Sequence, residues 1–161
     1  MDALYTANVT ARGGRQGSVK SDDGTLQLDL SMPKGLGGSG GSGTNPEQLF
    51  AAGYSACFNG ALALVARKRD INADESTVTA HVSIGKEEDN LKLAVRLDVR
   101  FPGVDKATAE DLVREAHQVC PYSRATRGNI EVELNVLDAG SGEDVGSGSG
   151  TEKQAADSWG R

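Results

Sequence analysis

A run of 19 residues without a charge, from Gln48 to Ala66, occupies the middle of this sequence. Its length suits a membrane-spanning helix, which needs about 20 predominantly apolar residues. Its content is only weakly apolar, because many alanines are interspersed with polar or small residues such as Ser55, Asn59 and Gly60. We therefore predict the buried helix of a soluble protein rather than a membrane span.

The residues on either side of this run are typical of helix ends. Asn45 suits the N-cap, Pro46 the first helical position and Glu47 the positive first turn. The basic residues 67–69 suit the negative C-terminal end, so we expect a helix from about 46 to 69. Its bulky apolar residues point in every direction, so the helix must be enclosed. These residues are Leu49, Phe50, Tyr54, Phe58, Leu62, Leu64 and Val65.

Alternating apolar residues predict short strands before and after this helix. The expected strands cover 4–10, 16–20, 26–30, 78–84, 91–101 and 130–136, with a charged hairpin loop at 85–90. A second amphipathic helix is predicted from about Asp105 to the residue before Pro121. Runs of strands that look antiparallel, separated by two helices, favour an α+β fold over alternating βαβ units.

The chain divides into a domain at 1–137 and a tail at 138–161. The tail carries Gly-Ser repeats, an excess of acids and no apolar periodicity, so we expect it to be flexible. A domain of about 137 residues with half-exposed strands has little surface to spare for enclosing a helix on all sides. We therefore predict a homodimer that buries this helix near its interface.

Charge and cysteine content narrow the function classes. The net charge of −6 argues against a large surface for nucleic acid or anionic lipid. The N-terminus has no basic region followed by an apolar stretch, so we expect a cytoplasmic protein, where a working disulfide is usually transient and catalytic. Cys57 and Cys120 lie 63 positions apart and form no zinc signature with His81 and His117, so we expect no metal site.

The segment from Gly35 to Gly40 reads literally as G-x-G-x-x-G between a strand and a helix. In dinucleotide-binding motifs the last glycines open the helix, so that the pyrophosphate meets its N-terminus. Here Pro46 follows Gly40 only after six positions. We predict a mobile loop beside a site, or an ordinary surface loop, rather than a nucleotide site.

Two longer motifs carry a family resemblance. The segment G-T-N-P-E-Q-L-F-A-A-G-Y-S-A-C-F at 43–58 and the segment H-Q-V-C-P-Y-S-R-A-T-R-G-N at 117–129 resemble the organic hydroperoxide resistance (Ohr) branch of the OsmC-like family. Gly13-Gly14-Arg15 and the glycine loop also fit, so the match runs from about Tyr5 to Leu137. The departures are the extra tail and a short charged loop at 86–90.

The resemblance implies a fold, a reaction and a set of site residues. The fold would have antiparallel sheets around a long buried central helix, in an intertwined homodimer with its sites at the interface. The protein would be a thiol peroxidase with no bound cofactor, acting on organic hydroperoxides, including those of fatty acids, with lipoylated proteins as reductant. Cys57 would be the peroxidatic cysteine and Cys120 the resolving one, with Arg15 and Glu47 completing the site.

Physical chemistry assigns Arg15 and Glu47 a role in ionising the Cys57 thiol. The thiolate is the nucleophile, and a free thiol of pKa ~8.5 is only a few per cent ionised at pH 7. Cys57 lies about three turns inside its helix, beyond the reach of the helix dipole, and burial alone raises a thiol pKa. We therefore expect Arg15 to lower the pKa of Cys57, with Glu47 orienting the guanidinium through a bidentate pair.

Several alternatives stay open. Phe50, Tyr54 and Phe58 either line an apolar substrate pocket or pack the core. His117, one turn before Cys120, is read as a structural helix histidine rather than a proton carrier. The rival function, from another class, is a non-enzymatic redox sensor or binding scaffold that uses the same cysteine pair.

Overall fold

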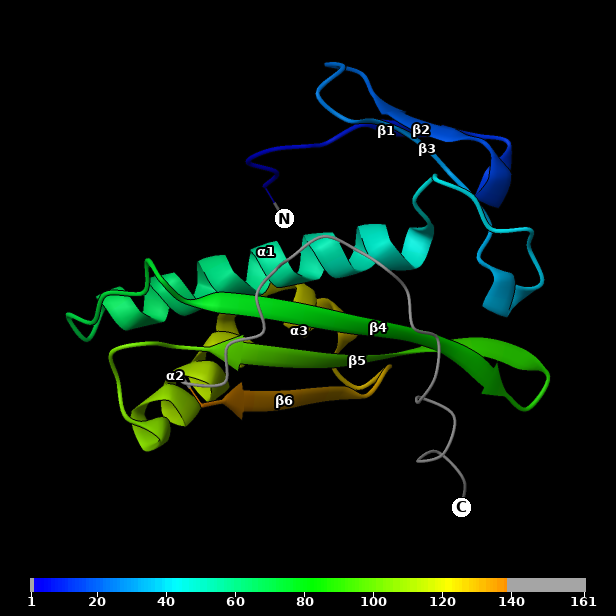
Figure 1. Ribbon diagram of the computed structural model, residues 1–161. Helices are drawn as coiled ribbons and strands as arrows, with labels where there is room; N and C mark the ends of the chain where they lie inside the picture. Colours follow the sequence, from blue (N-terminus) through cyan, green and yellow to red (C-terminus); the bar gives the residue numbers. More distant parts are fainter. Residues whose placement is uncertain (1, 139–161) are drawn as a thin grey trace.

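The computed structural model describes residues 2–138 (Figure 1), so all of the expected tail except Asp138 lies outside the described residues. An antiparallel sheet in the order β1-β2-β3 comes first, followed by a second sheet in the order β4-β5-β6 and three helices. The α+β class is confirmed. The elements are β1 (Val9–Arg12), β2 (Ser18–Ser21), β3 (Gln27–Asp29), α1 (Pro46–Arg67), β4 (Thr77–Glu87), β5 (Asn90–Arg100), α2 (Lys106–Val119), α3 (Pro121–Thr126) and β6 (Val132–Leu137).

The start of α1 is built as its sequence predicts. The Asn45 side chain accepts a hydrogen bond of 2.9 Å from the backbone N–H of Gln48, Pro46 is the first helical residue, and Glu47 stands in the first turn. The helix ends at Arg67, two positions earlier than expected, and the chain turns at Asp70, which has a left-handed φ of 53°. The cap fixes where the helix begins, and therefore which side chains face the sheet.

The hydrophobic core lies between α1, α2 and the second sheet. Tyr54, Phe58 and Leu62 of α1 have no exposed surface, and they pack with Leu97 of β5 and Leu112 of α2, which are equally buried. Each such side chain contributes roughly 1.5–3 kcal/mol through burial. By length and composition α1 is apolar enough to cross a membrane. Its buried face is instead the centre of this core, as predicted.

Three elements differ from the sequence-based expectations. The β4 and β5 strands run to Glu87 and from Asn90, so the expected loop at 85–90 shrinks to a turn at 88–89. The expected strand at 4–10 begins only at Val9, because Leu4 and Tyr5 are 101% and 82% exposed and have no surface to pack on. Cross-strand pairing decides such boundaries, and it is not visible in a single run of residues.

The second sheet is mixed rather than wholly antiparallel. β4 and β5 form an antiparallel hairpin, but β6 pairs with β5 in parallel, from Val95 opposite Val132 to Arg100 opposite Leu137. A parallel neighbour needs a long crossover, and α2 with α3 supplies it. The second of these helices was not predicted. It begins at Pro121, directly after the residue that ends α2.

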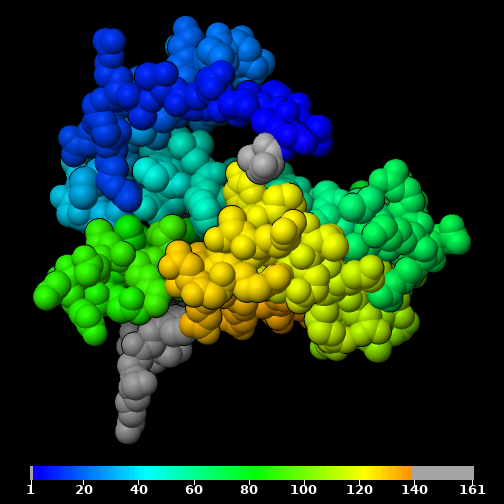
Figure 2. Space-filling model, turned by 180° about the vertical axis from the view of Figure 1, so that it is seen from behind, coloured from blue at the N-terminus to red at the C-terminus, as the bar shows by residue number. Residues whose placement is uncertain are grey.

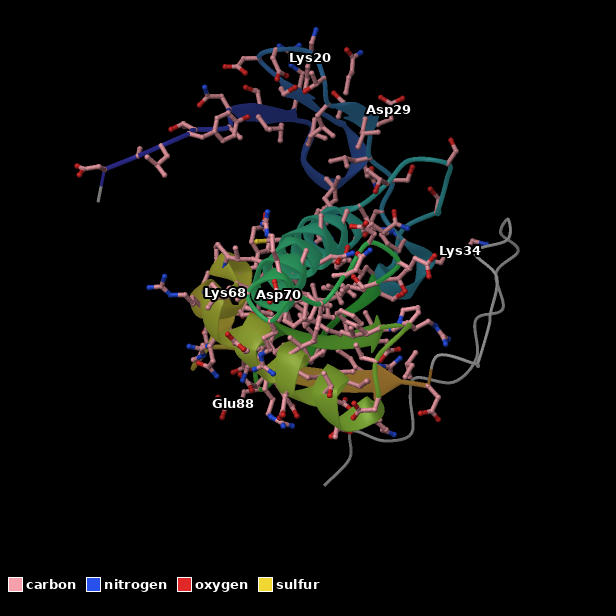
Figure 3. The ribbon with its side chains drawn as sticks, turned by 90° about the vertical axis from the view of Figure 1, so that its left-hand side faces the viewer. Lys20, Asp29, Lys34, Lys68, Asp70 and Glu88 are labelled. Atoms are coloured by element: carbon pink, nitrogen blue, oxygen red, sulfur yellow. The ribbon has the colours of Figure 1, made fainter. Side chains whose placement is uncertain are left out.

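The first sheet lies apart from the body of the chain, which consists of the three helices and the second sheet. Figures 1 and 2 show β1–β3 above the rest of the chain, and Figure 3, which looks along α1 from the end marked by Lys68 and Asp70, shows Lys20 and Asp29 far from the core. Every residue of β1 and β3 is exposed. Short strands of this kind need an apolar surface to pack against. β2 buries Val19 and Ser21, but neither belongs to the core between α1, α2 and the second sheet.

The glycine-rich segment joins the two parts. After β3 the chain forms a short 3-10 turn at Lys34–Leu36, and α1 begins at Pro46, so the glycines do not open the helix. Gly38 passes so close to the backbone that a Cβ there would lie 2.1 Å from the carbonyl oxygen of Met32. Only glycine fits at that approach.

Candidate active site

The two cysteines lie together, although 63 positions separate them. Cys57 is in the middle of α1 and Cys120 is the C-cap residue directly after α2, and their sulfur atoms are 3.7 Å apart. Cys120 is fully buried, Cys57 is half-buried, and both are free thiols. A disulfide has a bond of about 2.05 Å, so small side-chain movements would join this pair.

The surroundings of Cys57 favour its neutral thiol. Burial raises the pKa of Cys57, and the neighbouring Cys120 raises it further, while the backbone N–H of Tyr122 acts in the opposite direction by stabilising the thiolate. A thiolate is needed for nucleophilic attack. A positive charge must therefore be brought to Cys57 from elsewhere if it is to react quickly at neutral pH.

Arg15 and Glu47 form an ion pair with two hydrogen bonds. Arg15 lies in the 3-10 turn Gly14–Gln16 between β1 and β2, and it donates from Nη1 to Oε2 at 2.9 Å and from Nη2 to Oε1 at 2.8 Å. The Arg15 hydrogen bonds lower the pKa of Glu47, and Glu47 in turn raises the pKa of Arg15. This pair ties the turn of the first sheet to the first turn of α1.

The ion pair and the cysteine pair are separate within one chain. Glu47 and Cys57 are ten residues apart on the same helix, which corresponds to about 15 Å along its axis. The causes that shift the pKa of Cys57 are burial, Cys120 and Tyr122, and Arg15 is not among them. The structure thus joins Cys57 to Cys120 and Arg15 to Glu47, but it does not join these two pairs to each other.

Sequence reasoning assigned no role to three residues of α3, the helix that begins directly after Cys120. The backbone of Tyr122 acts against burial by lowering the pKa of Cys57. Ser123 and Thr126 hold the buried Tyr54 hydroxyl at 3.0 and 3.2 Å. The available signal was Pro121, since proline is favoured at the first position of a helix and its place after Cys120 marks a new helix rather than only the end of the last.

The three aromatic residues of α1 lie in the core or pack against it. Tyr54 and Phe58 are fully buried core residues. Phe50 is half-buried and packs edge-on against Tyr54, with ring centroids 5.9 Å apart. A cavity of about 450 Å³ lies at the start of α1 instead. Its walls are Pro33, Gly35, Leu36, Asn45, Glu47, Gln48, Ala80, Val82 and Ile84.

The described residues offer no cluster of metal ligands. Among residues 2–138, no three His, Cys, Asp or Glu side chains are grouped closely enough to hold a metal ion. His117 lies one turn before Cys120, and burial, together with the charge of Arg127, lowers its pKa. Its neutral form is therefore favoured at pH 7. Its buried Nδ1 has no hydrogen-bond partner among the described residues, so the structural role expected for it stays a prediction.

Comparison with known proteins identifies the family and agrees with the fold. The family described as OsmC-like protein matches residues 38–135. The chain belongs to the OsmC-like family. Within it, the chain falls in the branch of organic hydroperoxide resistance proteins, because one from Xanthomonas axonopodis pv. citri is 52% identical over 134 residues, covering 83% of this chain and 94% of that protein.

Solved structures extend the comparison to the fold. The organic hydroperoxide resistance protein OhrB of Bacillus subtilis superposes with a TM-score of 0.78 at 50% identity, covering 84% of this chain and all of that one. The corresponding protein from Elizabethkingia anophelis gives a TM-score of 0.80 at 55% identity, covering 86% and 99% of the two chains. The antiparallel first sheet, the mixed second sheet and the long helix are thus a shared architecture.

Proposed function

We propose that this protein is a cysteine-based peroxidase that reduces organic hydroperoxides to alcohols. The observation that carries the proposal is the 3.7 Å separation of the Cys57 and Cys120 sulfurs, one half-buried and one enclosed. A half-buried nucleophile can meet a substrate, whereas a buried thiol is suited to react only with its neighbour. The relatives are named for resistance to organic hydroperoxides, which supports the substrate class.

The proposed reaction has three balanced steps. The Cys57 thiolate attacks one peroxide oxygen, the O–O bond breaks, and the alkoxide leaves as the alcohol after taking a proton. Cys57 is then a sulfenic acid, which condenses with the Cys120 thiol to form a disulfide and release water. An external dithiol, proposed to be a lipoylated protein, reduces the disulfide and is itself oxidised to the cyclic disulfide. No bound cofactor or metal is needed for these steps.

We propose that the cation required by Cys57 comes from a second subunit. Two α1 helices that cross antiparallel on a two-fold axis near Ala52 would bring position 47 of one helix opposite position 57 of the other. Ala52 and Ala56 are exposed and small, which permits the two helices to approach closely. Arg15 of the partner subunit, oriented by its ion pair, would then lower the pKa of Cys57.

The unpacked first sheet supports the same dimer. Its strands expose Val9 and Leu28 at 49% and 38%, and α1 exposes Leu64 at 43%. A sheet without a core of its own gains stability when a partner covers its apolar side. An intertwined homodimer, in which each first sheet lies over the partner's α1, would cover both surfaces. We further propose a cytoplasmic location, where stable disulfides are rare and a working disulfide is usually transient and catalytic.

The central test is multiple turnover. The protein is mixed with tert-butyl hydroperoxide and dihydrolipoamide, and loss of the peroxide is followed beside a Cys57→Ser variant and a Ser55→Ala variant as matched control. We expect many turnovers for the unmodified protein and the control, and none for Cys57→Ser. A single oxidation per chain without turnover would reject the peroxidase and favour the redox sensor or binding scaffold.

The shared site is tested by mixing two inactive variants. Arg15→Ala and Cys57→Ser chains are each expected to be nearly inactive as homodimers. If Arg15 serves the partner, each mixed dimer regains one intact site, made of Cys57 from one chain and Arg15 from the other. If Arg15 serves its own chain, mixing restores nothing. A scattering mass equal to one chain would reject the dimer altogether.

A further inference from the structure

A buried tyrosine hydroxyl lies at the junction of the two cysteine-bearing segments. Tyr54 has no exposed surface, and its hydroxyl oxygen is 3.0 Å from Ser123 Oγ and 3.2 Å from Thr126 Oγ1, both in buried residues of α3. Burying a polar group costs free energy unless its hydrogen bonds are made. Phenylalanine would fill the same space without this requirement, so the hydroxyl calls for a specific explanation.

The hydroxyls of this cluster are connected to the backbone of α3. Thr126 Oγ1 lies 3.0 Å from the carbonyl oxygen of Tyr122 and 3.2 Å from that of Ser123, and a carbonyl only accepts, so the Thr126 hydroxyl is the donor in these contacts. When Thr126 donates to the backbone, its lone pair accepts from the Tyr54 hydroxyl, which in turn accepts from Ser123. These hydrogen bonds form one chain that ends on the first turn of α3, and the bonds within such a chain strengthen one another.

Two groups at the start of α3 act on the Cys57 sulfur. Cys120 immediately precedes α3 and places its sulfur 3.7 Å from that of Cys57, and the Tyr122 N–H stabilises the Cys57 thiolate. Tyr54 is three residues before Cys57, so both side chains lie on neighbouring positions of the same helix surface. Whatever fixes α3 against Tyr54 also fixes its distance from Cys57.

The ring of Tyr122 supplies an independent sign that α3 must sit close to α1. A Cβ at Gly53 would lie 2.8 Å from the Tyr122 hydroxyl oxygen, so glycine leaves the space that this ring occupies. The ring also packs against those of Tyr54 and Phe50, with centroids 5.7 and 6.1 Å away. The close approach of the two helices is thus built by both polar and apolar contacts.

We propose that Tyr54, Ser123 and Thr126 are positioning residues for the second step of the reaction. They hold Cys120 and the Tyr122 N–H at Cys57, so that the sulfenic acid condenses with the Cys120 thiol and releases water before more peroxide arrives. This inference rests on the proposed peroxidase chemistry. Loss of the Tyr54 hydrogen bonds leaves both thiols present but loosens their alignment. A misplacement of about 1 Å can slow a reaction step by up to about 10²-fold.

The test follows the fate of Cys57 after one equivalent of tert-butyl hydroperoxide. Tyr54→Phe removes only the hydroxyl, and Tyr5→Phe, at a residue 82% exposed, is the matched control. The rate of disulfide formation is measured by quenched flow and mass spectrometry, and the Cys57 sulfenic acid is trapped with dimedone. We expect Tyr54→Phe to form the disulfide about tenfold more slowly and to accumulate more trapped sulfenic acid, with the control unchanged.

Further variants separate positioning from simple loss of stability. Thr126→Ser keeps the hydroxyl and is expected to retain the rate, whereas Thr126→Val and Ser123→Ala are expected to slow the step. The pH dependence of the alkylation rate of Cys57 reports the pKa of this thiol. We expect this pKa to rise in Tyr54→Phe, because the Tyr122 N–H that stabilises the thiolate is displaced. A folded Tyr54→Phe or Thr126→Val variant with an unchanged disulfide rate overturns the inference. Absence of any disulfide in the unmodified protein overturns the proposed function instead.

Discussion

The first sheet and the body of this chain are stabilised in different ways. The body has strands of 11 residues in β4 and β5 and a core of fully buried side chains from three elements. The first sheet has strands of three or four residues, and most of these residues are exposed. It is joined to the body by the glycine-rich segment and by the Arg15–Glu47 ion pair. The cysteines belong to the body and Arg15 to the sheet. The proposed chemistry therefore depends on where the less stable region is placed.

The largest expected effect lies in the body. Leu62→Ala empties a site with no exposed surface, so we expect the free energy of unfolding to fall by about 2–5 kcal/mol. Leu91→Ala, at a residue 64% exposed near the tip of the β4–β5 hairpin, is the matched control and is expected to change it by less than about 0.5 kcal/mol. Urea unfolding measures both. Equal losses would mean that the core is not where the stability resides.

A smaller effect is expected where the two regions meet. Asn45→Ala removes the side chain that caps α1, and we expect a loss of about 1 kcal/mol in the free energy of unfolding. Asn45→Ser or Asn45→Asp keeps a capping oxygen and is expected to restore most of it. Urea unfolding again provides the measurement, and a full loss in Asn45→Asp would show that the cap is not the cause.

Breaking the ion pair is expected to release the first sheet locally. The guanidinium of Arg15 is about one-third exposed, so solvent screening keeps its contribution below about 1 kcal/mol. We expect Arg15→Ala to speed amide exchange about threefold in residues 18–29 while the exchange of β5 stays unchanged. Arg69→Ala, which breaks the exposed Arg69–Glu115 pair at the other end of α1, is the control. Equal acceleration of β5 would show that the two regions unfold together.

Acid is expected to give the smallest effect, through the same ion pair. Glu47 has a lowered pKa in the folded protein, so its pairing stabilises the structure above its unfolded pKa of about 4.3 and is lost as the pH falls through the folded value. We expect pepsin to cut residues 13–30 faster as the pH is lowered from 5 to 3. In Glu47→Gln the rate is expected to depend less on pH. Identical pH profiles of cleavage in the unmodified protein and in Glu47→Gln would show that Glu47 does not cause the acid effect.

Sequence reasoning succeeded where a signal is local. The cap at Asn45, the proline after it and the enclosed apolar run predict α1 with its correct start, and they do so because each acts within one turn of the helix. The same reasoning failed for the partner strand of β6 and for α3. Strand partners are chosen by the packing of distant segments, and a six-residue helix has too little periodicity to show a face.

The sequence by itself determined the α+β class, the long core helix and the identity of the two cysteines as the reactive candidates, because composition, caps and motifs are properties of neighbouring residues. Only the tertiary structure decided that the sulfurs of Cys57 and Cys120 lie 3.7 Å apart and that Ser123 binds the buried Tyr54 hydroxyl. It also decided that Arg15 pairs with Glu47 about 15 Å along α1 from Cys57. Such distances follow from how helices pack on one another, which no stretch of chain encodes alone.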